Sequence, residues 1–321
     1  MAQIYSAYEI SENGFNKVIL EDESNSTRVE IIPSCGAMLH AFQVISGGSF
    51  LNIIDSYTNR EDFENNAESA GFKGLKLSPF VCRIRDAAYQ FNGKKYHFNK
   101  LYPDGSAIHG LLYRSAFQVI KLHGAAGEAR VLMEYNYDGS DSGYPFGYNC
   151  AVEYKLEPLQ KLTISTTLKN PGPSSIPVAD GWHPYFTFGK KIDELMLQFQ
   201  GPEIVEFENL IPTGKLLPNK DFLEFQRIGN TVMDHSFVLD FKREQPMCTL
   251  MDPASGLALE IFPDRIYRYL QIYTPPHRKS IALENLSGAP DCFNNKMGLE
   301  ILESGQEITF STKYKINSSR N

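Results

Sequence analysis

Short strand-forming segments, repeated along the chain and separated by turn formers, constrain the fold of this protein most strongly. Each segment is rich in β-branched or aromatic residues, or alternates apolar with polar residues, as strands do. Glycine, proline, asparagine and aspartate punctuate them, as in Asn170-Pro171-Gly172-Pro173. The predicted strands are Arg28–Pro33, Ala41–Ile45, Ala88–Phe98, Arg130–Tyr137, Cys150–Leu156, Leu162–Leu168, Glu194–Gln200, Met247–Met251, Leu257–Phe262, Tyr269–Tyr273, Ile281–Leu286 and Glu307–Ile316.

The segment Ala88–Phe98 predicts a β-hairpin with a defined register. Asn92-Gly93 at its centre is the strongest two-residue hairpin signal. Folding at this turn pairs Phe91 with Lys94 and Tyr89 with Tyr96. The aromatic side chains of the segment then share one face, so the hydrophobic pattern and the turn agree on the register.

Helical patterns are weak along the whole chain. Residues Asp62–Ala70 predict one short helix, and no strands alternate with long amphipathic helices, which disfavours a parallel α/β sheet. No internal repeat or low-complexity linker divides the sequence. We therefore predict an all-β fold, a large antiparallel β-sandwich with few short helices, formed as a single domain by residues 1–321.

Composition places the chain among ordinary globular proteins. It has 321 residues, of which 42% are apolar and 21% charged, and its formal net charge is −7. No basic block favours nucleic acid as a partner, and no apolar run is long enough to span a bilayer. The N-terminal residues lack the pattern of a signal peptide, which predicts a cytoplasmic protein. The five cysteines form no Cys-x-x-Cys pair, so we expect free, mostly buried thiols.

The hexapeptide Gly181-Trp182-His183-Pro184-Tyr185-Phe186 is the most distinctive motif. It combines a protonatable ring with flat apolar faces, which suits a site for sugar chemistry, and Pro184 stiffens the backbone after His183. The alternative is a strand end whose aromatic side chains belong to the core. Since neighbours on an extended segment point to opposite faces, Trp182 is predicted to support the core while His183 faces a groove.

Glu284 is the candidate carboxylate. Alternation along Ile281–Leu286 places Ile281 and Leu283 on one face, and Ala282 with Glu284 on the other. The small side chain of Ala282 leaves room for a ligand above the carboxylate. A solvated structural carboxylate is the alternative, since these greatly outnumber catalytic ones.

Four further side chains are candidates for binding. His109 precedes Gly110, which permits a tight turn, although taken alone this pattern is more typical of a loop histidine that caps a backbone carbonyl. Arg83 and Arg85 are expected to point the same way from an extended strand, where they would bind hydroxyls or anions or form a charged outer face. Asp234 could accept from a sugar hydroxyl or cap a turn.

Taken in order, these motifs resemble the aldose 1-epimerase (galactose mutarotase-like) family. The resemblance runs from about residue 25 to the C-terminus. The family has an Asn-Arg-Ile-like strand, a hairpin, His-Gly, His-Pro-Tyr-Phe, Asp-His-x-Phe and Leu-Glu. The corresponding segments are Cys82-Arg83-Ile84, the Asn92-Gly93 hairpin, His109-Gly110, His183-Pro184-Tyr185-Phe186, Asp234-His235-Ser236-Phe237 and Leu283-Glu284.

Three positions depart from the family pattern. Cys82 stands where the family usually has Asn, Thr187 where it often has Asn, and Asn285-Leu286 where Pro-Gln is commoner. These departures spare the acid and base that the resemblance implies. They indicate a divergent member, for which galactose should not be assumed as the sugar.

The resemblance implies a mutarotase that interconverts the α and β anomers of a hexose by opening and closing the ring. Glu284 would be the base and His183 the acid, while Arg83, His109, Asp234 and Tyr185 would bind the sugar. A histidine with a pKa near 6.5 can donate a proton near neutrality, and burial can make a carboxylate a better base. The reaction requires no metal and no cofactor.

Alternative functions remain open from the sequence. A hexose-6-phosphate 1-epimerase would need cations from Arg85 or from His277-Arg278-Lys279. A non-catalytic carbohydrate-binding protein would keep the groove without the acid–base pair, and a glycosidase would use two carboxylates, here Asp234 and Glu284. The expected partner is a monosaccharide of the glucose or galactose type, bound by a monomer or weak homodimer.

Overall fold

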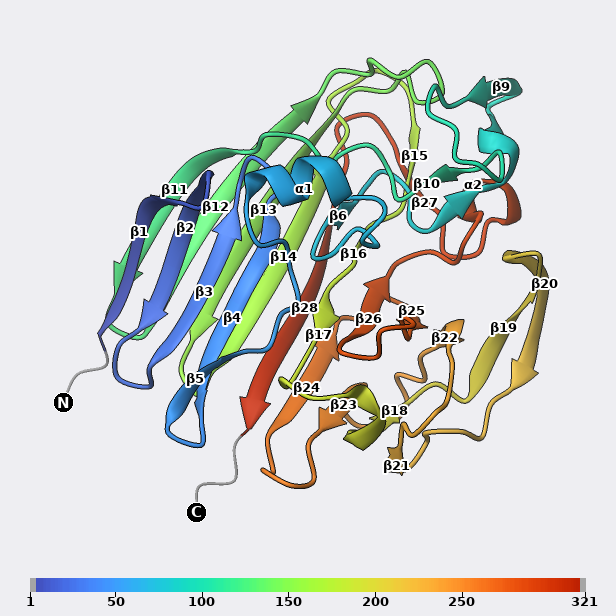
Figure 1. Cartoon of the computed structure of the whole chain (residues 1–321). Coiled ribbons are helices and arrows are strands. Elements are labelled where there is room, and N and C mark those ends of the chain that lie inside the picture. Colours follow the sequence, from blue (N-terminus) through green and yellow to red (C-terminus); the bar gives the residue numbers. More distant parts are fainter. Residues whose placement is uncertain (1–3, 318–321) are drawn as a thin grey trace.

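The computed structural model describes residues 4–317, and antiparallel β-sheets are its dominant secondary structure (Figure 1). The N-terminal sheet has five strands in sequence order, joined as a meander. They are β1 (Tyr5–Glu12), β2 (Phe15–Asp22), β3 (Thr27–Ile32), β4 (Met38–Ser46) and β5 (Ser49–Asn52).

The largest sheet has nine strands and combines the middle of the chain with its C-terminal part. In spatial order they are β11 (Gln118–Ala125), β12 (Glu128–Tyr137), β13 (Tyr148–Glu157), β14 (Lys161–Lys169), β28 (Glu307–Asn317), β24 (Ala258–Pro263), β23 (Cys248–Met251), β18 (Met196–Phe199) and β21 (Gln226–Arg227). The strand β28 thus lies in the middle of the sheet, which ties the end of the chain to residues 161–169.

A sheet of eight strands carries most of the candidate site. Its main path is β20 (Ile211–Pro218), β19 (Glu203–Glu208), β22 (Asp234–Val238), β25 (Tyr269–Tyr273), β26 (Ile281–Leu286), β16 (Gly181–Trp182) and β6 (Lys76–Leu77). The eighth strand, β17 (Tyr185–Phe186), also pairs with β26.

Short elements complete the described structure. Three two-stranded sheets pair β7 (Arg83–Ile84) with β10 (Ala107–Ile108), β8 (Ala88–Phe91) with β9 (Lys94–His97), and β15 (Ile176–Val178) with β27 (Glu300–Leu302). The α-helices are α1 (Arg60–Asn66) and α2 (Cys292–Asn295), and single 3₁₀ turns span Arg85–Ala87 and Ile192–Glu194.

The sheets stack face to face, as in a β-sandwich. The strands β1 and β2 lie against β11, β12 and β13, so the five-stranded sheet covers one half of the nine-stranded sheet. The eight-stranded sheet covers the other half. Asn285 of β26 donates to Thr312 of β28 at 2.9 Å, and the ring of Phe186 packs edge-on against Tyr314. The buried side chains between the layers form a large apolar core.

The structure confirms the predicted antiparallel β-sandwich and the register of the hairpin. Tyr89 lies opposite Tyr96 and Phe91 opposite Lys94, and the turn residues Asn92 and Gly93 both have positive φ angles of 48° and 76°. Each predicted segment forms a strand, with small shifts at its ends. The predicted helix exists but lies at Arg60–Asn66, because the Asn59 side chain accepts from the Asp62 amide and starts the helix earlier than expected.

Two further observations concern the cysteines and the helices. All five cysteines are free and buried, as expected. Within residues 4–317, no helix has both the length and the apolar character needed to cross a membrane.

Candidate active site

One cavity brings the predicted site residues together. It has a volume of about 350 Å³, within the usual range for small-molecule sites, and lies over the eight-stranded sheet. Loops from other parts of the chain form its remaining walls. Six candidates of the sequence analysis line it: Arg83, His109, His183, Tyr185, Asp234 and Glu284. The cationic residues Arg85 and 277–279 are not part of this lining.

His183 and Glu284 face each other across two paired segments. Gly181 pairs with Leu286 and Tyr185 pairs with Ala282, so this register places His183 opposite Glu284. The His183 Nε2 atom lies 3.4 Å from Glu284 Oε1. The other polar atom of each side chain, His183 Nδ1 and Glu284 Oε2, is buried without a hydrogen-bond partner among the described residues. A buried polar pair of this kind has unused hydrogen-bonding capacity for a ligand.

Contacts beneath the sheet hold the hexapeptide in place. Trp182 is buried, packs edge-on against Tyr154, and lies with its ring centre 4.4 Å from Lys76 Nζ. The same ammonium group lies 2.5 Å from Asp180 Oδ1, and neither side chain is exposed. The structure therefore confirms that Trp182 supports the core while His183 turns to the opposite side.

Burial disfavours charge on both members of the His183–Glu284 pair. It lowers the pKa of His183 to about 3 and, together with the nearby charge of Asp234, raises the pKa of Glu284 well above 4.5. Both shifts favour a pair without charge, in which Glu284 holds the proton and the His183 ring is neutral. A pair that shares one proton can donate at one atom and accept at another, which is what general acid–base catalysis requires.

His109 approaches the pair from a tight turn. It has a φ angle of 61°, its amide donates to the Cys82 carbonyl at 2.7 Å, and its ring centre lies 5.1 Å from that of His183. A Cβ on Gly110 would lie 2.3 Å from the Ser78 carbonyl oxygen, so only glycine permits this turn. Burial, followed by the charges of His183 and Arg83, lowers the pKa of His109 well below 6.5. His109 is therefore a neutral donor or acceptor.

Arg83 and Asp234 supply charges on two other walls of the cavity. Arg83 belongs to β7 and forms an ion pair with Asp104. Asp234 is the first residue of β22, and burial raises its pKa above the usual value, although His235 and Arg83 oppose this effect. Asp234 thus lines the cavity and does not cap a turn, which was the alternative.

Gln271 is a cavity residue that the sequence analysis missed. It lies directly opposite Glu284 in the pairing of β25 with β26, and its Nε2 atom donates to Asp234 Oδ1 at 2.8 Å. Its Oε1 atom is buried without a partner among the described residues. One signal was available, because Tyr269, Gln271 and Tyr273 alternate along a predicted strand next to the strand of Glu284.

Tyr185 forms the wall beside His183. The two rings are parallel within 3°, with centres 5.1 Å apart. A Cβ on Gly71 would lie 2.5 Å from the Tyr185 hydroxyl oxygen, so the chain passes this ring only because residue 71 is glycine. Tyr185 is almost fully buried. It can therefore offer an edge to a ligand, and it also holds the His183 ring in one orientation.

Two cationic clusters predicted as possible contributors lie elsewhere. The expectation that Arg83 and Arg85 point the same way is wrong, because β7 ends at Ile84 and Arg85 begins a 3₁₀ turn in which Asp86 has a φ angle of 52°. Arg85 lies along a separate surface groove. Arg278 pairs with Asp193, and its neighbours on either side line another open cleft.

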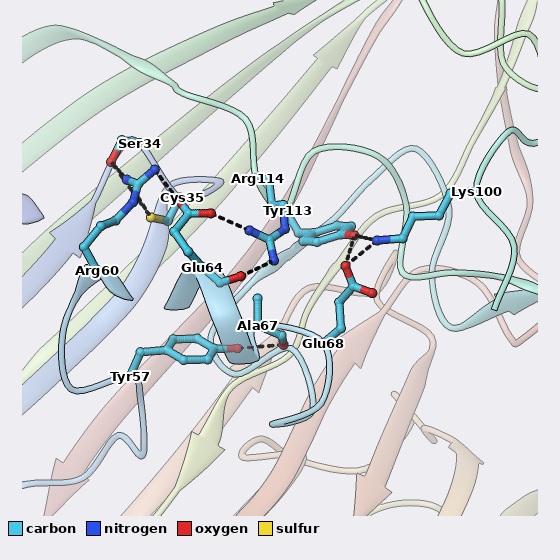
Figure 2. A network of polar contacts seen from close by, with 10 residues as sticks. All are labelled: Ser34, Cys35, Tyr57, Arg60, Glu64, Ala67, Glu68, Lys100, Tyr113 and Arg114. Carbon is cyan, nitrogen blue, oxygen red and sulfur yellow. Dashed lines mark hydrogen bonds and ion pairs between the residues drawn. The ribbon is translucent and has the colours of Figure 1, made fainter. Parts of the chain in front are cut away.

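A second missed region is the wall that follows helix α1. Glu68 and Phe72 both line the cavity. The Glu68 carboxylate is bound by Lys100 and by the Tyr113 hydroxyl, as Figure 2 shows. The sequence gives little indication of this wall, since Glu68 stands in a polar stretch with no regular pattern. Within residues 4–317, no group of three or more His, Cys, Asp or Glu side chains is placed to hold a metal ion.

Comparison with known proteins identifies the family. The sequence profile of the aldose 1-epimerase family matches residues 17–315. The chain belongs to the aldose 1-epimerase family. An uncharacterized protein, YihR, from Escherichia coli is 27% identical over 73% of this chain and 75% of its own length. A maltose epimerase from Levilactobacillus brevis is 22% identical over 81% of this chain and 80% of its own length.

The fold agrees with solved structures of this family. The structure of a galactose mutarotase-like protein from Clostridium acetobutylicum superposes with a TM-score of 0.87, covering 98% of this chain and 99% of the other. The sequences of the two proteins are 18% identical. At this level of identity the likeness establishes the sandwich fold, and the chemistry must be argued from the site.

The three departures from the family pattern lie at different distances from the cavity. Cys82 lines it, so the substitution bears directly on what the cavity binds. Thr187 lies outside, where its hydroxyl donates to the Lys279 carbonyl. Asn285 points away from the cavity to Thr312 between the sheets.

Proposed function

We propose that this protein is an aldose 1-epimerase that interconverts the anomers of a neutral hexose, with Glu284 as the base and His183 as the acid. One observation carries the proposal. Two buried acid–base groups lie 3.4 Å apart and present unpartnered polar atoms within a cavity of suitable size for a sugar. Such groups cost stability unless a ligand uses them.

In the proposed reaction the proton of the pair lies on His183, and the Glu284 carboxylate removes the proton from the anomeric hydroxyl. His183 donates its proton to the ring oxygen as the bond between this oxygen and the anomeric carbon breaks, which leaves an open-chain aldehyde. Rotation about the next carbon–carbon bond exposes the other face of the carbonyl. The two residues then return the protons in the reverse sense as the ring closes, so no proton is gained or lost.

Arg83, His109, Asp234 and Tyr185 are proposed to position the sugar, and Gln271 joins them. Asp234 and Gln271 form one hydrogen-bonded unit beside Glu284. Together they can accept and donate to neighbouring hydroxyls. His109, held neutral by burial, can bond the ring oxygen or an adjacent hydroxyl without adding a charge.

Charge argues for a neutral sugar over a hexose 6-phosphate. Arg83 is the one Lys or Arg side chain among the described residues that line the cavity, and it is already paired with Asp104. The carboxylates of Glu68 and Asp234 share the same lining, and Glu284 adds a third acidic group. A phosphate dianion placed here would meet more negative than positive charge.

The test is polarimetry with purified protein. Freshly dissolved α-glucose, α-galactose and maltose should each change optical rotation by spontaneous mutarotation, and the protein should accelerate at least one of them. Maltose is included because of the name of the Levilactobacillus brevis relative. Glucose 6-phosphate, measured in parallel, should be a poorer substrate than glucose. Sugar binding with no acceleration would favour the non-catalytic carbohydrate-binding alternative.

Three further properties of the protein remain predictions. We expect a monomer or weak homodimer, a single domain over residues 1–321 and a cytoplasmic location. A glycosidase that uses Asp234 and Glu284 is less consistent with the site, because Asp234 is bonded to Gln271 while Glu284 faces His183.

A further inference from the structure

A row of aromatic rings runs from the acid–base pair to Glu68, another residue of the cavity lining. The ring centre of His109 lies 5.1 Å from that of His183, and the ring of Phe72 lies 4.5 Å from His109. The ring of Tyr113 follows at 5.3 Å from Phe72, and its hydroxyl donates to Glu68 at 3.0 Å. Glu68 lines the cavity, and the rings of His109, Phe72 and Tyr113 lie between it and His183 in this row.

The Glu68 carboxylate is held by one of its oxygens. Both Lys100 and the Tyr113 hydroxyl bond to Oε1, and Lys100 also donates to Tyr113 at 2.8 Å. In Figure 2 the second oxygen points away from this triangle. Although partial burial opposes ionisation, these contacts lower the pKa of Glu68 below 4.5, so it is a carboxylate near neutrality. An ionised carboxylate is an acceptor only, and sugar hydroxyls are suitable donors to it.

The position of Glu68 is fixed from the side of helix α1. The Tyr57 hydroxyl donates to the Ala67 carbonyl at 2.9 Å, which secures the residue just before Glu68. One turn earlier, Glu64 is bound by Arg60 at 2.5 Å and by Arg114 at 2.7 Å (Figure 2). A carboxylate anchored in this way loses little conformational entropy when it binds a ligand, so it can discriminate between ligands by geometry.

We propose that Glu68 is a specificity-determining residue that accepts a hydrogen bond from a sugar hydroxyl remote from the anomeric carbon. This inference rests on the proposed epimerase function, because it is the His183–Glu284 pair that defines which end of the cavity receives the anomeric centre. Lys100 and Tyr113 are positioning residues, since they act on the sugar through Glu68. The sugars accepted best would be those that present a hydroxyl at this end.

The experiment compares wild type with Glu68→Gln on sugars that differ at remote positions. Suitable substrates are glucose, its 4-epimer galactose, 6-deoxyglucose, and xylose, which lacks the terminal carbon. A hydrogen bond to a charged group contributes enough that wild type should prefer one of these over its modified counterpart by about tenfold or more in kcat/KM. Glu68→Gln should reduce that ratio towards one, mainly by raising KM for the preferred sugar.

Glu64→Gln is the matched control. Glu64 lies in α1, four residues before Glu68, and is bound by two cations, but it does not line the cavity. Any effect that acts only through the stability of α1 should appear in both variants as a lower Tm, and it should leave the ratios between sugars unchanged. Equal sugar ratios in wild type and a folded Glu68→Gln protein would overturn the inference.

The proposed function and this inference can fail separately. If wild type accelerates none of the sugars, the epimerase proposal fails, and binding of the same sugars is measured by saturation-transfer NMR. Weaker binding by Glu68→Gln, confined to sugars with the remote hydroxyl, would then still support a role for Glu68. Identical binding by the two proteins, or no binding by wild type, would overturn it.

Discussion

Two buried polar pairs, Lys76–Asp180 and His183–Glu284, differ in what surrounds them, although Asp180 and His183 are only three residues apart along the chain. Lys76 and Asp180 lie beneath the sheet, where they contact each other and gain further hydrogen bonds, the ammonium to the Gly181 carbonyl and the carboxylate from Tyr267. His183 and Glu284 lie on the cavity side and each keep a polar atom without a partner. The first pair is satisfied within the fold, whereas the second is available to a ligand at a cost in stability.

The largest expected effect is a loss of activity without a loss of stability when the His183–Glu284 pair is changed. Glu284→Gln and His183→Asn should each lower kcat by about a hundred- to ten-thousand-fold, the usual contribution of a general acid or base. Glu284→Gln should at the same time raise Tm at pH 7. The buried carboxylate has a raised pKa, so its ionisation above its usual value of 4.5 opposes folding, and a neutral amide removes that penalty.

The gain in Tm from Glu284→Gln should be absent below about pH 4.5, where the unfolded chain also carries a protonated Glu284. Polarimetry checks the loss of activity, and thermal unfolding across this pH range checks the change in Tm. Full activity in both variants would refute the assignment of acid and base. A lower Tm at pH 7 would show that the Glu284 carboxylate has a structural role like that of Asp180.

At the Lys76–Asp180 pair we expect the opposite result, a loss of stability. Lys76→Met leaves Asp180 buried without its cation and should cost about 3–5 kcal/mol of unfolding free energy. The double variant Lys76→Met/Asp180→Asn should recover part of this loss, because it removes the isolated charge. Urea unfolding, followed by the fluorescence of the single tryptophan, Trp182, measures the unfolding free energy of the single and the double variant. A neutral effect of Lys76→Met would contradict the distinction between the two pairs.

The smallest expected effect is on the pH profile. Because burial lowers the pKa of His183 to about 3, a second proton does not bind the pair until the pH is far below the usual histidine value of 6.5. The profile of kcat/KM reports the free enzyme and should therefore show no acid limb near pH 6.5. Activity should change by less than about tenfold between pH 7 and pH 5. A limb centred near pH 6.5 would mean that His183 titrates as an exposed imidazole.

The alternating pattern of single strands made parts of the site predictable. Glu284 and its neighbour Asn285 point to opposite faces of β26, as the period of a strand requires, and the same rule separates Trp182 from His183. The hairpin register followed from Asn92-Gly93 in the same way. In each case the information is local, because a strand or a two-residue turn has few conformations.

The rule failed where the backbone leaves the strand. Arg83 and Arg85 are separated because β7 ends after two residues, and the sequence Arg-Ile-Arg carries no signal for the 3₁₀ turn that follows. Gln271 and Glu68 were missed for another reason. Their roles depend on which strand lies beside Glu284 and on where the loop after α1 crosses the cavity.

The sequence by itself determined the strands, the faces of those strands and, through the order of its motifs, the family. These properties depend on backbone periodicity and on short segments, which are local. The tertiary structure decided which residues meet in the cavity, which polar atoms remain without partners, and that burial shifts the pKa values of His183 and Glu284 in opposite directions. Burial and pairing arise only when distant segments pack together, so no local pattern specifies them.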